Sequence, residues 1–232
     1  MVDNANSSSG CRECRLKSEA VRTLSEKDLK FLETGCKEVH LKAGEKLFIE
    51  GLPYAHVIFL KAGFVKVHMI GPTGKNQILK IAKPGAYIGI QTILGGEINH
   101  YSATTLTEVS SCFLKVDIFK DLILRNGKFA SEILKYVCAE ELNYYRRFVD
   151  QQQKQMNGRL ADAFLYLSDD IFLSRHFKIP FSNIDLAALI GSTREGVSRI
   201  LSGFKIEGVI HMKDRDVQIM DYKKLKKISE KG

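Results

Sequence analysis

The stretch STREGVSRILSGFKIEGVI, residues 192–210, holds the side chains best suited to specific chemistry. Read as a helix, it places Arg194, Glu195, Ser198 and Arg199 together on one face. Arginine can donate paired hydrogen bonds to guanine, glutamate can accept from the cytosine amino group, and serine can serve several base edges. This face therefore has the chemistry needed to read base edges in a DNA groove.

The opposite face of the same predicted helix is apolar. Val197, Ile200, Leu201 and Phe204 follow the i, i+3, i+4, i+7 spacing of a buried helical face. Burial of this stripe would leave the polar face pointing outward. A charged helix face is also a common solvated surface, so this pattern alone leaves both interpretations open.

The neighbouring segments predict how this helix is held. Upstream, SNIDLAALIG predicts a helix with a capping-box start at Ser182 and Asp185, and Gly191 allows a tight turn into the next helix. Two short helices joined in this way make a helix-turn-helix, in which the second helix enters the major groove. Ser192 and Thr193 lie at its entrance and complete the predicted DNA-contacting set.

The segment after this helix predicts a wing. GVIHM, KDRD and VQIMD are typical of a strand, a polar turn and a second strand. Such a hairpin would place Lys213 and Arg215 near DNA phosphates. The surrounding turn, wing and net charge of +8 favour nucleic acid as the partner.

The first half of the chain has a different pattern. From about Leu24 to Val116, short β-type runs such as KLFIEG, HVIFLKAG and FVKVHMIG stop at glycines. This spacing predicts an all-β roll, barrel or sandwich. From about Phe129 to Met156 there is neither Gly nor Pro, and an apolar stripe near heptad spacing predicts one long helix. That helix could pair two subunits or lie in the core of a monomer, and we favour the dimer.

These patterns give an α+β fold class in four segments. Residues 1–23 are expected to form a flexible tail with a CxxC motif, 24–128 a β-roll sensor, 129–156 a dimerisation helix, and 157–232 a winged helix-turn-helix. The sequence has no run of roughly 18 apolar residues and no signal-peptide pattern, so no membrane association and a cytoplasmic location are expected. Five cysteines without secretory context argue against a disulfide framework.

The segment 192–210 closely resembles the recognition helix of the CRP/FNR family of bacterial transcription regulators. KAGEKLFIEG, LKAGFVKV and KPGAYIG resemble the glycine-punctuated strands of the family's cyclic-nucleotide-binding-like jelly roll, and the order of segments matches almost end to end. The resemblance implies a sequence-specific homodimer on a palindromic DNA site, with RNA polymerase as a further partner. Glu195 with Ser198 and Arg199 resembles the Glu-x-x-Ser-Arg pattern of the FNR branch.

The ligand motif departs from the cyclic-nucleotide-binding relatives. Their roll carries a glutamate for the ribose and an arginine for the phosphate, followed by a hydroxyl residue. By spacing, Ile90 replaces the glutamate, His100 the arginine and Tyr101 the hydroxyl residue. Isoleucine cannot accept a ribose hydrogen bond, and a mostly neutral histidine binds phosphate poorly. The sequence therefore argues against cyclic AMP and predicts an altered effector pocket at these three residues.

The cysteines suggest a different signal. Cys11-x-x-Cys14 and Cys112 resemble part of the cysteine set that holds an iron–sulfur cluster in oxygen-sensing members of the FNR branch. The next expected cysteine falls near Ala20, so the set is incomplete, and Cys36 is a substitute whose reach the sequence does not define. Zinc binding, a redox dithiol or no function also fit a CxxC motif.

Haem is the other cofactor that the resemblance allows. Some family members sense gases through haem, and His40, His56, His68 and His100 lie in or near the predicted roll without diagnostic spacing. We find no P-loop, G-x-S-x-G, H-E-x-x-H or dinucleotide motif, so an enzyme is not expected. The alternative to a DNA-binding regulator is a ligand-binding module whose winged helix contacts protein.

Overall fold

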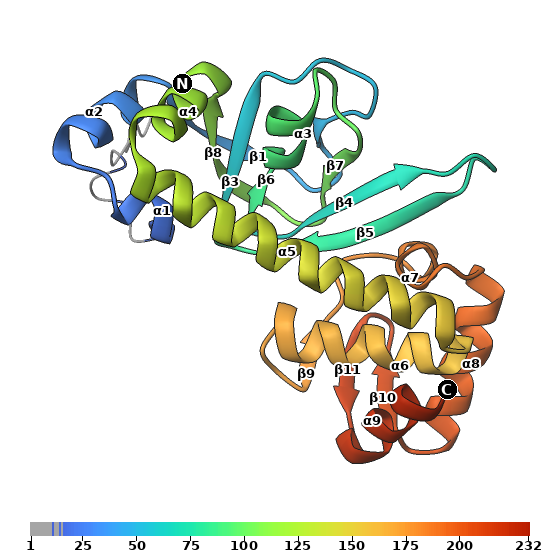
Figure 1. The fold of residues 1–232 in the computed structure, drawn as a ribbon. Coiled ribbons are helices and arrows are strands. Elements are labelled where there is room, and N and C mark those ends of the chain that lie inside the picture. The colour runs from blue at the N-terminus through green and yellow to red at the C-terminus, as the bar shows by residue number, and fades with distance from the viewer. Residues whose placement is uncertain (1–10, 12–13, 15) are drawn as a thin grey trace, which may run out of the picture. The chain divides into compact units, whose positions relative to one another are not determined.

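The computed structural model of the chain describes residues 11, 14 and 16–232 (Figure 1). The remainder of the predicted tail lies outside the described residues. The chain divides into two compact units, each with its own core: the first is Met1–Val65 with Ala82–Glu141, and the second is Lys66–Ile81 with Leu142–Gly232.

The first unit is built on an antiparallel four-stranded sheet in the order β1-β8-β3-β6. Its strands are β1 (Cys36–Leu41), β8 (Val109–Lys115), β3 (His56–Ala62) and β6 (Tyr87–Ile88). A second antiparallel pair joins β2 (Lys46–Phe48) to β7 (Ser102–Thr105). The short strands separated by glycine-rich turns agree with the predicted roll.

This unit also contains helices, two of which lie where the sequence predicted only strands. They are α1 (Glu19–Arg22), α2 (Glu26–Thr34), α3 (Ile90–Gly95) and α4 (Val116–Arg125). The prediction of an all-β stretch from Leu24 was therefore wrong for α2 and α3. The Ser25 side chain accepts a hydrogen bond from the backbone N–H of Asp28, which starts α2 as a capped helix.

The core of the first unit lies where α4 and the start of α5 (Gly127–Gln153) pack against the sheet. Phe119 and Phe129 are fully buried, and their ring centroids lie 5.6 Å apart in an edge-on arrangement. Val57 and Leu114 from the sheet belong to the same hydrophobic cluster. Edge-to-face aromatic contact adds to the burial of apolar surface that stabilises this unit.

Replacing Phe119 with alanine should lower the free energy of unfolding by about 3–5 kcal/mol, because it leaves a cavity in this core. Leu124 lies on the same helix but is 85% exposed. Leu124→Ala should therefore change the free energy by no more than about 0.5 kcal/mol. Urea unfolding followed by circular dichroism measures both values. Equal effects would contradict the assignment of the core.

The long helix forms as predicted with shifted ends. The sequence predicted residues 129–156, whereas α5 spans Gly127–Gln153. It stops earlier because α6 (Met156–Tyr166) begins there, with Gln155 as its N-cap. Because neither Gly nor Pro lies at this break, the apolar periodicity continues across it and the predicted helix extends too far.

The second unit contains a β-hairpin and the C-terminal helical domain. The hairpin is β4 (Val65–Ile70) with β5 (Asn76–Ala82), and the C-terminal elements are α6, the π-helix η1 (Leu167–Ile171), β9 (His176–Lys178), α7 (Asn183–Ile190), α8 (Arg194–Ile206), β10 (Ile210–Lys213), β11 (Asp216–Ile219) and α9 (Tyr222–Lys231). The wing is a three-stranded sheet in the order β10-β11-β9. Strand β9 and helix α9 were not predicted.

The hydrophobic core of the second unit packs against the apolar face of α8. Phe164 of α6 is fully buried, and the predicted inward residues of α8 are buried as expected: Val197, Ile200, Leu201 and Phe204. Helix α9 packs on α6 and buries Leu225 completely. Among the described residues, no helix combines the length and the apolar character that crossing a membrane requires.

Candidate nucleic-acid interface and thiol-lined cavity

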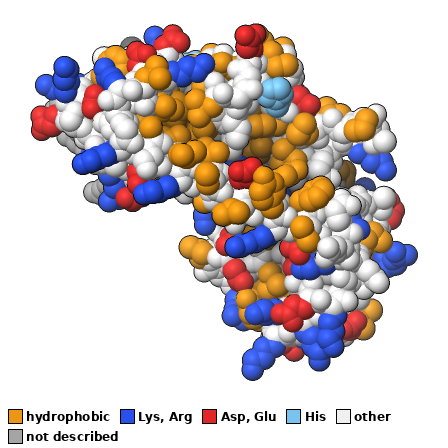
Figure 2. Space-filling view, in the orientation of Figure 1, with side chains coloured by type: hydrophobic (Ala, Val, Ile, Leu, Met, Phe, Trp, Pro, Cys, Tyr) orange, Lys and Arg blue, Asp and Glu red, His pale blue; other side chains and the backbone are white. Residues whose placement is uncertain are grey.

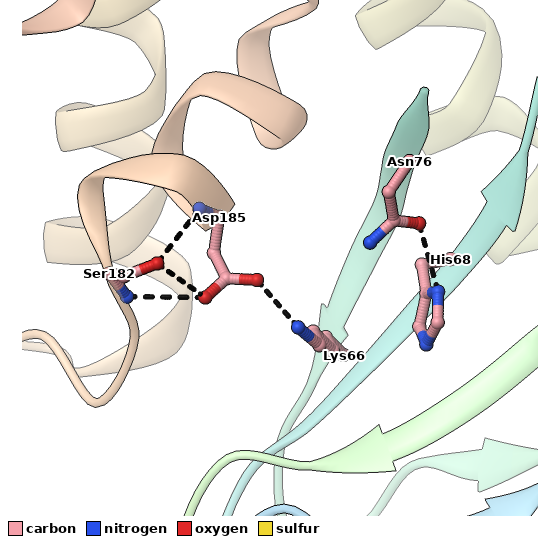
Figure 3. A network of polar contacts seen from close by, with 5 residues as sticks. All are labelled: Lys66, His68, Asn76, Ser182 and Asp185. Carbon is pink, nitrogen blue, oxygen red and sulfur yellow. Dashed lines mark hydrogen bonds and ion pairs between the residues drawn. The ribbon is translucent and has the colours of Figure 1, made fainter. Parts of the chain in front are cut away.

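A reciprocal capping box fixes the start of α7. The Ser182 hydroxyl accepts from the backbone N–H of Asp185 at 3.2 Å, and the Asp185 carboxylate accepts from the backbone N–H of Ser182 at 3.2 Å (Figure 3). Lys66 of the β4–β5 hairpin donates to the same carboxylate at 2.5 Å. Burial works to raise the pKa of Asp185, but the hydrogen bond and charge of Lys66 together with the hydrogen bonds from Ser182 outweigh it and hold this pKa below its usual value. The predicted cap therefore forms and is charged.

The turn between α7 and α8 depends on Gly191 and on two hydroxyl residues. Gly191 has a φ of 63°, in the left-handed region that favours glycine. The Thr193 hydroxyl accepts from the backbone N–H of Gly196 at 3.1 Å and so caps α8, and the Ser192 hydroxyl donates to the sulfur of Met156 at 3.0 Å. Both hydroxyls are therefore engaged in building the turn, and their contacts with DNA stay predictions.

Two glycine-to-alanine changes should have opposite effects in this motif. Gly191→Ala should lower the free energy of unfolding by about 1–2 kcal/mol, since an L-residue is strained at that φ. Gly203 lies inside α8 with open space around its Cβ position. Gly203→Ala should raise the free energy by about 0.5–1 kcal/mol through helix propensity. Thermal unfolding measures both, and effects of the same sign would contradict this account of the turn.

Because the turn and the hydrophobic core fix the orientation of α8, one polar face of this helix points toward solvent. Arg194, Glu195, Ser198 and Arg199, here called the recognition face, are all exposed. Within the described part of the chain, the side chains of Arg194, Glu195 and Arg199 form no hydrogen bond or ion pair. The N-terminal end of a helix also carries partial positive charge that favours phosphate. The recognition face is thus positioned and chemically able to meet a nucleic acid.

The wing presents two basic side chains at its tip. Strands β10 and β11 pair antiparallel, with Lys213 opposite Asp216 and a two-residue turn of Asp214 and Arg215 between them. Asp214 has a φ of 55°, as tight hairpin turns require. Lys213 and Arg215 are both exposed, in agreement with a phosphate-contacting role.

Helix α9 adds basic side chains that the sequence reasoning missed. It carries five lysines: Lys223, Lys224, Lys226, Lys227 and Lys231. Asp221 caps it by accepting from the backbone N–H of Lys224 at 2.8 Å. The aspartate followed by Leu225 and Ile228 at helical spacing was the signal that could have predicted this helix.

A cavity of about 330 Å³ lies in the first unit, and four of the chain's cysteines line it: Cys11, Cys14, Cys36 and Cys112. We call it the thiol-lined cavity. It includes the three cysteines predicted as a metal set, and it adds Cys36. The fifth cysteine, Cys138, is exposed on α5 and does not line it.

The pairing of β1 with β8 places two of these thiols on the same face of the sheet. In the β1–β8 pair, Cys36 lies opposite Leu114 and Glu38 lies opposite Cys112. Because side chains two residues apart share a face, Cys36 and Cys112 occupy diagonal positions on one face of the sheet. Gly35 precedes Cys36, and a Cβ there would lie 2.5 Å from a carbon of Ile118, so only glycine permits this close approach to α4.

A hydrogen bond ties the N-terminal segment to the same region. The hydroxyls of Ser18 and Tyr87 lie 2.6 Å apart, and Ser18 also caps α1 by accepting from the backbone N–H of Val21. Both Ser18 and Tyr87 line the cavity. Ser18 is thereby held at the cavity that Cys36 and Cys112 also line.

The thiol of Cys36 interacts with those of Cys11 and Cys112, and the pKa of each of the three is shifted as a result. The bond from the Cys36 thiol lowers the pKa of Cys11 and of Cys112 below the ordinary value, against the opposing effect of burial. The same contacts raise the pKa of Cys36. Lys61 at the cavity wall donates to Glu38 at 2.8 Å. Thiolate character is therefore favoured on two of the four sulfurs.

The predicted effector residues lie elsewhere in the first unit. Ile90 is 1% exposed and belongs to the hydrophobic core. The Tyr101 hydroxyl accepts from the backbone N–H of Gly89 at 3.1 Å and donates to Gln91 at 3.1 Å, while His100 is exposed beside Gly96. None of the three lines the thiol-lined cavity. An effector pocket at these positions stays a prediction.

The described parts of the chain contain no group of three His, Cys, Asp or Glu side chains ready to hold a single metal ion. The four thiols line one cavity, but among the described residues they do not form a group ready for one ion. The arrangement therefore differs from a preformed zinc site, in which four ligands meet tetrahedrally.

A roll-like sheet unit, a long helix and a winged helix-turn-helix with an outward polar face are the features of a class of DNA-binding transcription regulators. Two family models match the chain: the cyclic nucleotide-binding domain at residues 38–126 and the Crp-like helix-turn-helix domain at residues 158–228. The chain belongs to the CRP/FNR family of transcription regulators. Its helix-turn-helix favours DNA over protein as the partner of the winged helix.

Individual relatives agree over most of the chain. An anaerobic regulatory protein of Pasteurella multocida is 25% identical over 219 residues, covering 91% of this chain and 79% of that protein. A CRP-like cAMP-activated global transcriptional regulator of Mycobacterium tuberculosis is 24% identical over 191 residues, covering 81% and 85%. The structure of FixK2 from Bradyrhizobium japonicum has the same fold, with a TM-score of 0.76 at 19% identity, covering 83% and 96%.

Proposed function

We propose that the protein acts as a homodimer that reads a palindromic DNA site through the recognition face of each subunit. The observation that carries this proposal is the outward face of α8, where the side chains of Arg194, Glu195 and Arg199 are exposed and form no hydrogen bond or ion pair with other described residues. Arginine and glutamate read base edges, while Lys213 and Arg215 of the wing contact phosphates. Two-fold symmetry sets the two helices into successive major grooves.

Helix α5 supplies the dimer interface. Tyr144, Phe148 and Val149 are about half exposed on it, and the rings of Tyr144 and Phe148 stack with centroids 6.4 Å apart. Figure 2 displays hydrophobic side chains gathered along this helix. Exposed aromatic and aliphatic side chains at near-heptad spacing are typical of a helix that pairs with its copy.

The signal is received in the first unit and is not cyclic AMP. The position of the ribose-binding glutamate is Ile90, which is buried in the core and cannot accept a hydrogen bond, so the residues do not fit a cyclic nucleotide. The thiol-lined cavity is the better sensor, and a redox signal matches its chemistry. No described histidine lines it, so it does not fit a histidine-ligated haem.

Cys11, Cys14 and Cys112 fit an iron–sulfur cluster, because they are soft thiol ligands on one cavity. Such a cluster would supply sensitivity to oxygen or to redox state. The chain's own contribution is to hold the thiols together and to favour thiolate on Cys11 and Cys112. A change there shifts the equilibrium between conformations that differ in affinity for DNA.

The remaining parts of the proposal follow from the family. The protein works in the cytoplasm, RNA polymerase is its partner at promoters, and no catalytic step is assigned to it. Repeated selection of random duplexes by the purified protein tests the proposal. We expect enrichment of a palindrome with half-sites about one helical turn apart. Recovery of random sequences would overturn it and favour the alternative of a protein-contacting module.

A further inference from the structure

The predicted cluster lacks a ligand. A cluster of the four-iron type takes four cysteine thiolates. The N-terminal segment supplies Cys11 and Cys14, and β8 supplies Cys112, but Ala20 stands where the resemblance expects another cysteine. The methyl side chain of Ala20 has no donor atom, so it cannot act as a ligand, and it is 3% exposed in the core of the first unit.

Cys36 lies where the missing ligand is needed. It lines the same cavity as Cys11 and Cys14, on the sheet face that also bears Cys112. Its position is fixed by β1 pairing and by the close packing of Gly35 against Ile118. Cys36 is therefore within reach of the other three cysteines that line the cavity, which the sequence alone did not define.

The cavity wall suits a buried inorganic cluster. Leu32, Val57, Phe59 and Leu114 supply apolar side chains, and the Lys61–Glu38 ion pair adds no net charge. Four thiols arranged around about 330 Å³ suit a group larger than one ion, in keeping with the lack of a ready single-ion site among the described residues. Thiolates also select iron–sulfur clusters over hard cations.

We propose that Cys36 is the fourth thiolate ligand, with Cys11, Cys14 and Cys112, of an iron–sulfur cluster in the thiol-lined cavity. This inference rests on the redox sensor of the proposed function and names the residue that completes it. Two ligands come from the N-terminal segment and two from the sheet. Ligation by all four would add to the Ser18–Tyr87 hydrogen bond in joining these two parts of the first unit.

Protection of individual thiols tests the proposal on the native sequence. The full-length protein is loaded with ferrous iron and sulfide under anaerobic conditions, then alkylated without unfolding and analysed by mass spectrometry. We expect Cys11, Cys14, Cys36 and Cys112 to be at least tenfold less labelled in the loaded than in the metal-free protein. Cys138, which is exposed on α5, should label equally in both and serves as the internal control. Unchanged labelling of Cys36 beside protection of the other three would overturn the proposal.

A matched pair of variants provides a second test of the assignment of Cys36 as a ligand. Cys36→Ser should lose most of the bound iron and acid-labile sulfide, whereas Cys138→Ser should retain the wild-type content. Wild-type content in Cys36→Ser would contradict the ligand assignment. If Cys36→Ser does not fold, the labelling pattern of the wild-type protein still decides.

The two proposals fail separately. Wild-type protein that takes up neither iron nor sulfide overturns the cluster and the role of Cys36 together. Selection of duplexes is carried out with both the metal-free and the iron- and sulfide-treated protein, and enrichment of a palindrome by either form supports the DNA-binding proposal whether or not a cluster forms. Zinc uptake without sulfide, protecting the same four thiols, also overturns the iron–sulfur assignment.

Discussion

Replacing Arg199 with alanine should weaken binding to the preferred DNA site by about 1–3 kcal/mol, the usual value of a bidentate contact with a base. Arg199 is exposed on α8 and has no partner among the described side chains, so the variant removes no contact that the folded chain itself uses. Binding to random duplex should weaken far less, because only one phosphate-directed charge is lost. Fluorescence anisotropy at a fixed salt concentration measures both affinities.

Arg22→Ala is the charge-matched control. Arg22 lies in the first unit, 58% exposed, and pairs only weakly at the surface with Glu19 at 3.5 Å. Its loss should leave selectivity between the two duplexes unchanged. If Arg199→Ala weakened both duplexes equally, Arg199 would act only by neutralising phosphate, and its assignment as a base-reading residue would be wrong.

Phe148→Asp should shift the protein from dimer to monomer. Phe148 is 51% exposed on α5 and stacks with Tyr144, and in the proposed dimer both copies are buried at the interface. Aromatic residues at the centre of an interface commonly contribute about 2 kcal/mol or more. A charge at this position adds the cost of burying a carboxylate. We expect monomer by analytical ultracentrifugation at micromolar concentration, and loss of tight binding to the palindrome.

Asn143→Asp introduces the same charge on the same helix, roughly 140° around it from Phe148. Asn143 is also exposed, so the substitution leaves the folded chain intact. This variant should remain dimeric. A dimeric Phe148→Asp protein would place the interface elsewhere and leave the exposed aromatic residues of α5 without a role.

The recognition face could be predicted from the sequence because its signals are local. Helical periodicity separated Arg194 and Arg199 from Val197 and Ile200, and burial in the structure follows that division. The capping box of Ser182 with Asp185 also depends on residues three apart. The structure adds Lys66, whose contact with Asp185 joins positions 119 residues apart and has no sequence signature.

The thiol-lined cavity could be predicted only in part, because it also depends on contacts between residues that are far apart in the sequence. The resemblance to the FNR branch indicated Cys11, Cys14 and Cys112, but the place of Cys36 depends on the register of β1 with β8. That register is a long-range property, which single-sequence patterns do not contain. Helix α2 was missed although Ser25 and Asp28 form a recognisable cap, because strand-like runs around it dominated the interpretation.

The most direct test of the central claim is the affinity of the wild-type protein for its selected palindrome, compared with a duplex in which one half-site is scrambled and with random duplex. Anisotropy titrations at one salt concentration supply all three values. We predict a preference of at least about a thousandfold for the palindrome over random duplex, with the scrambled half-site lying between them. Equal affinity for all three, with the same dependence on salt, would show that the protein binds only phosphates and would contradict sequence reading by a dimer.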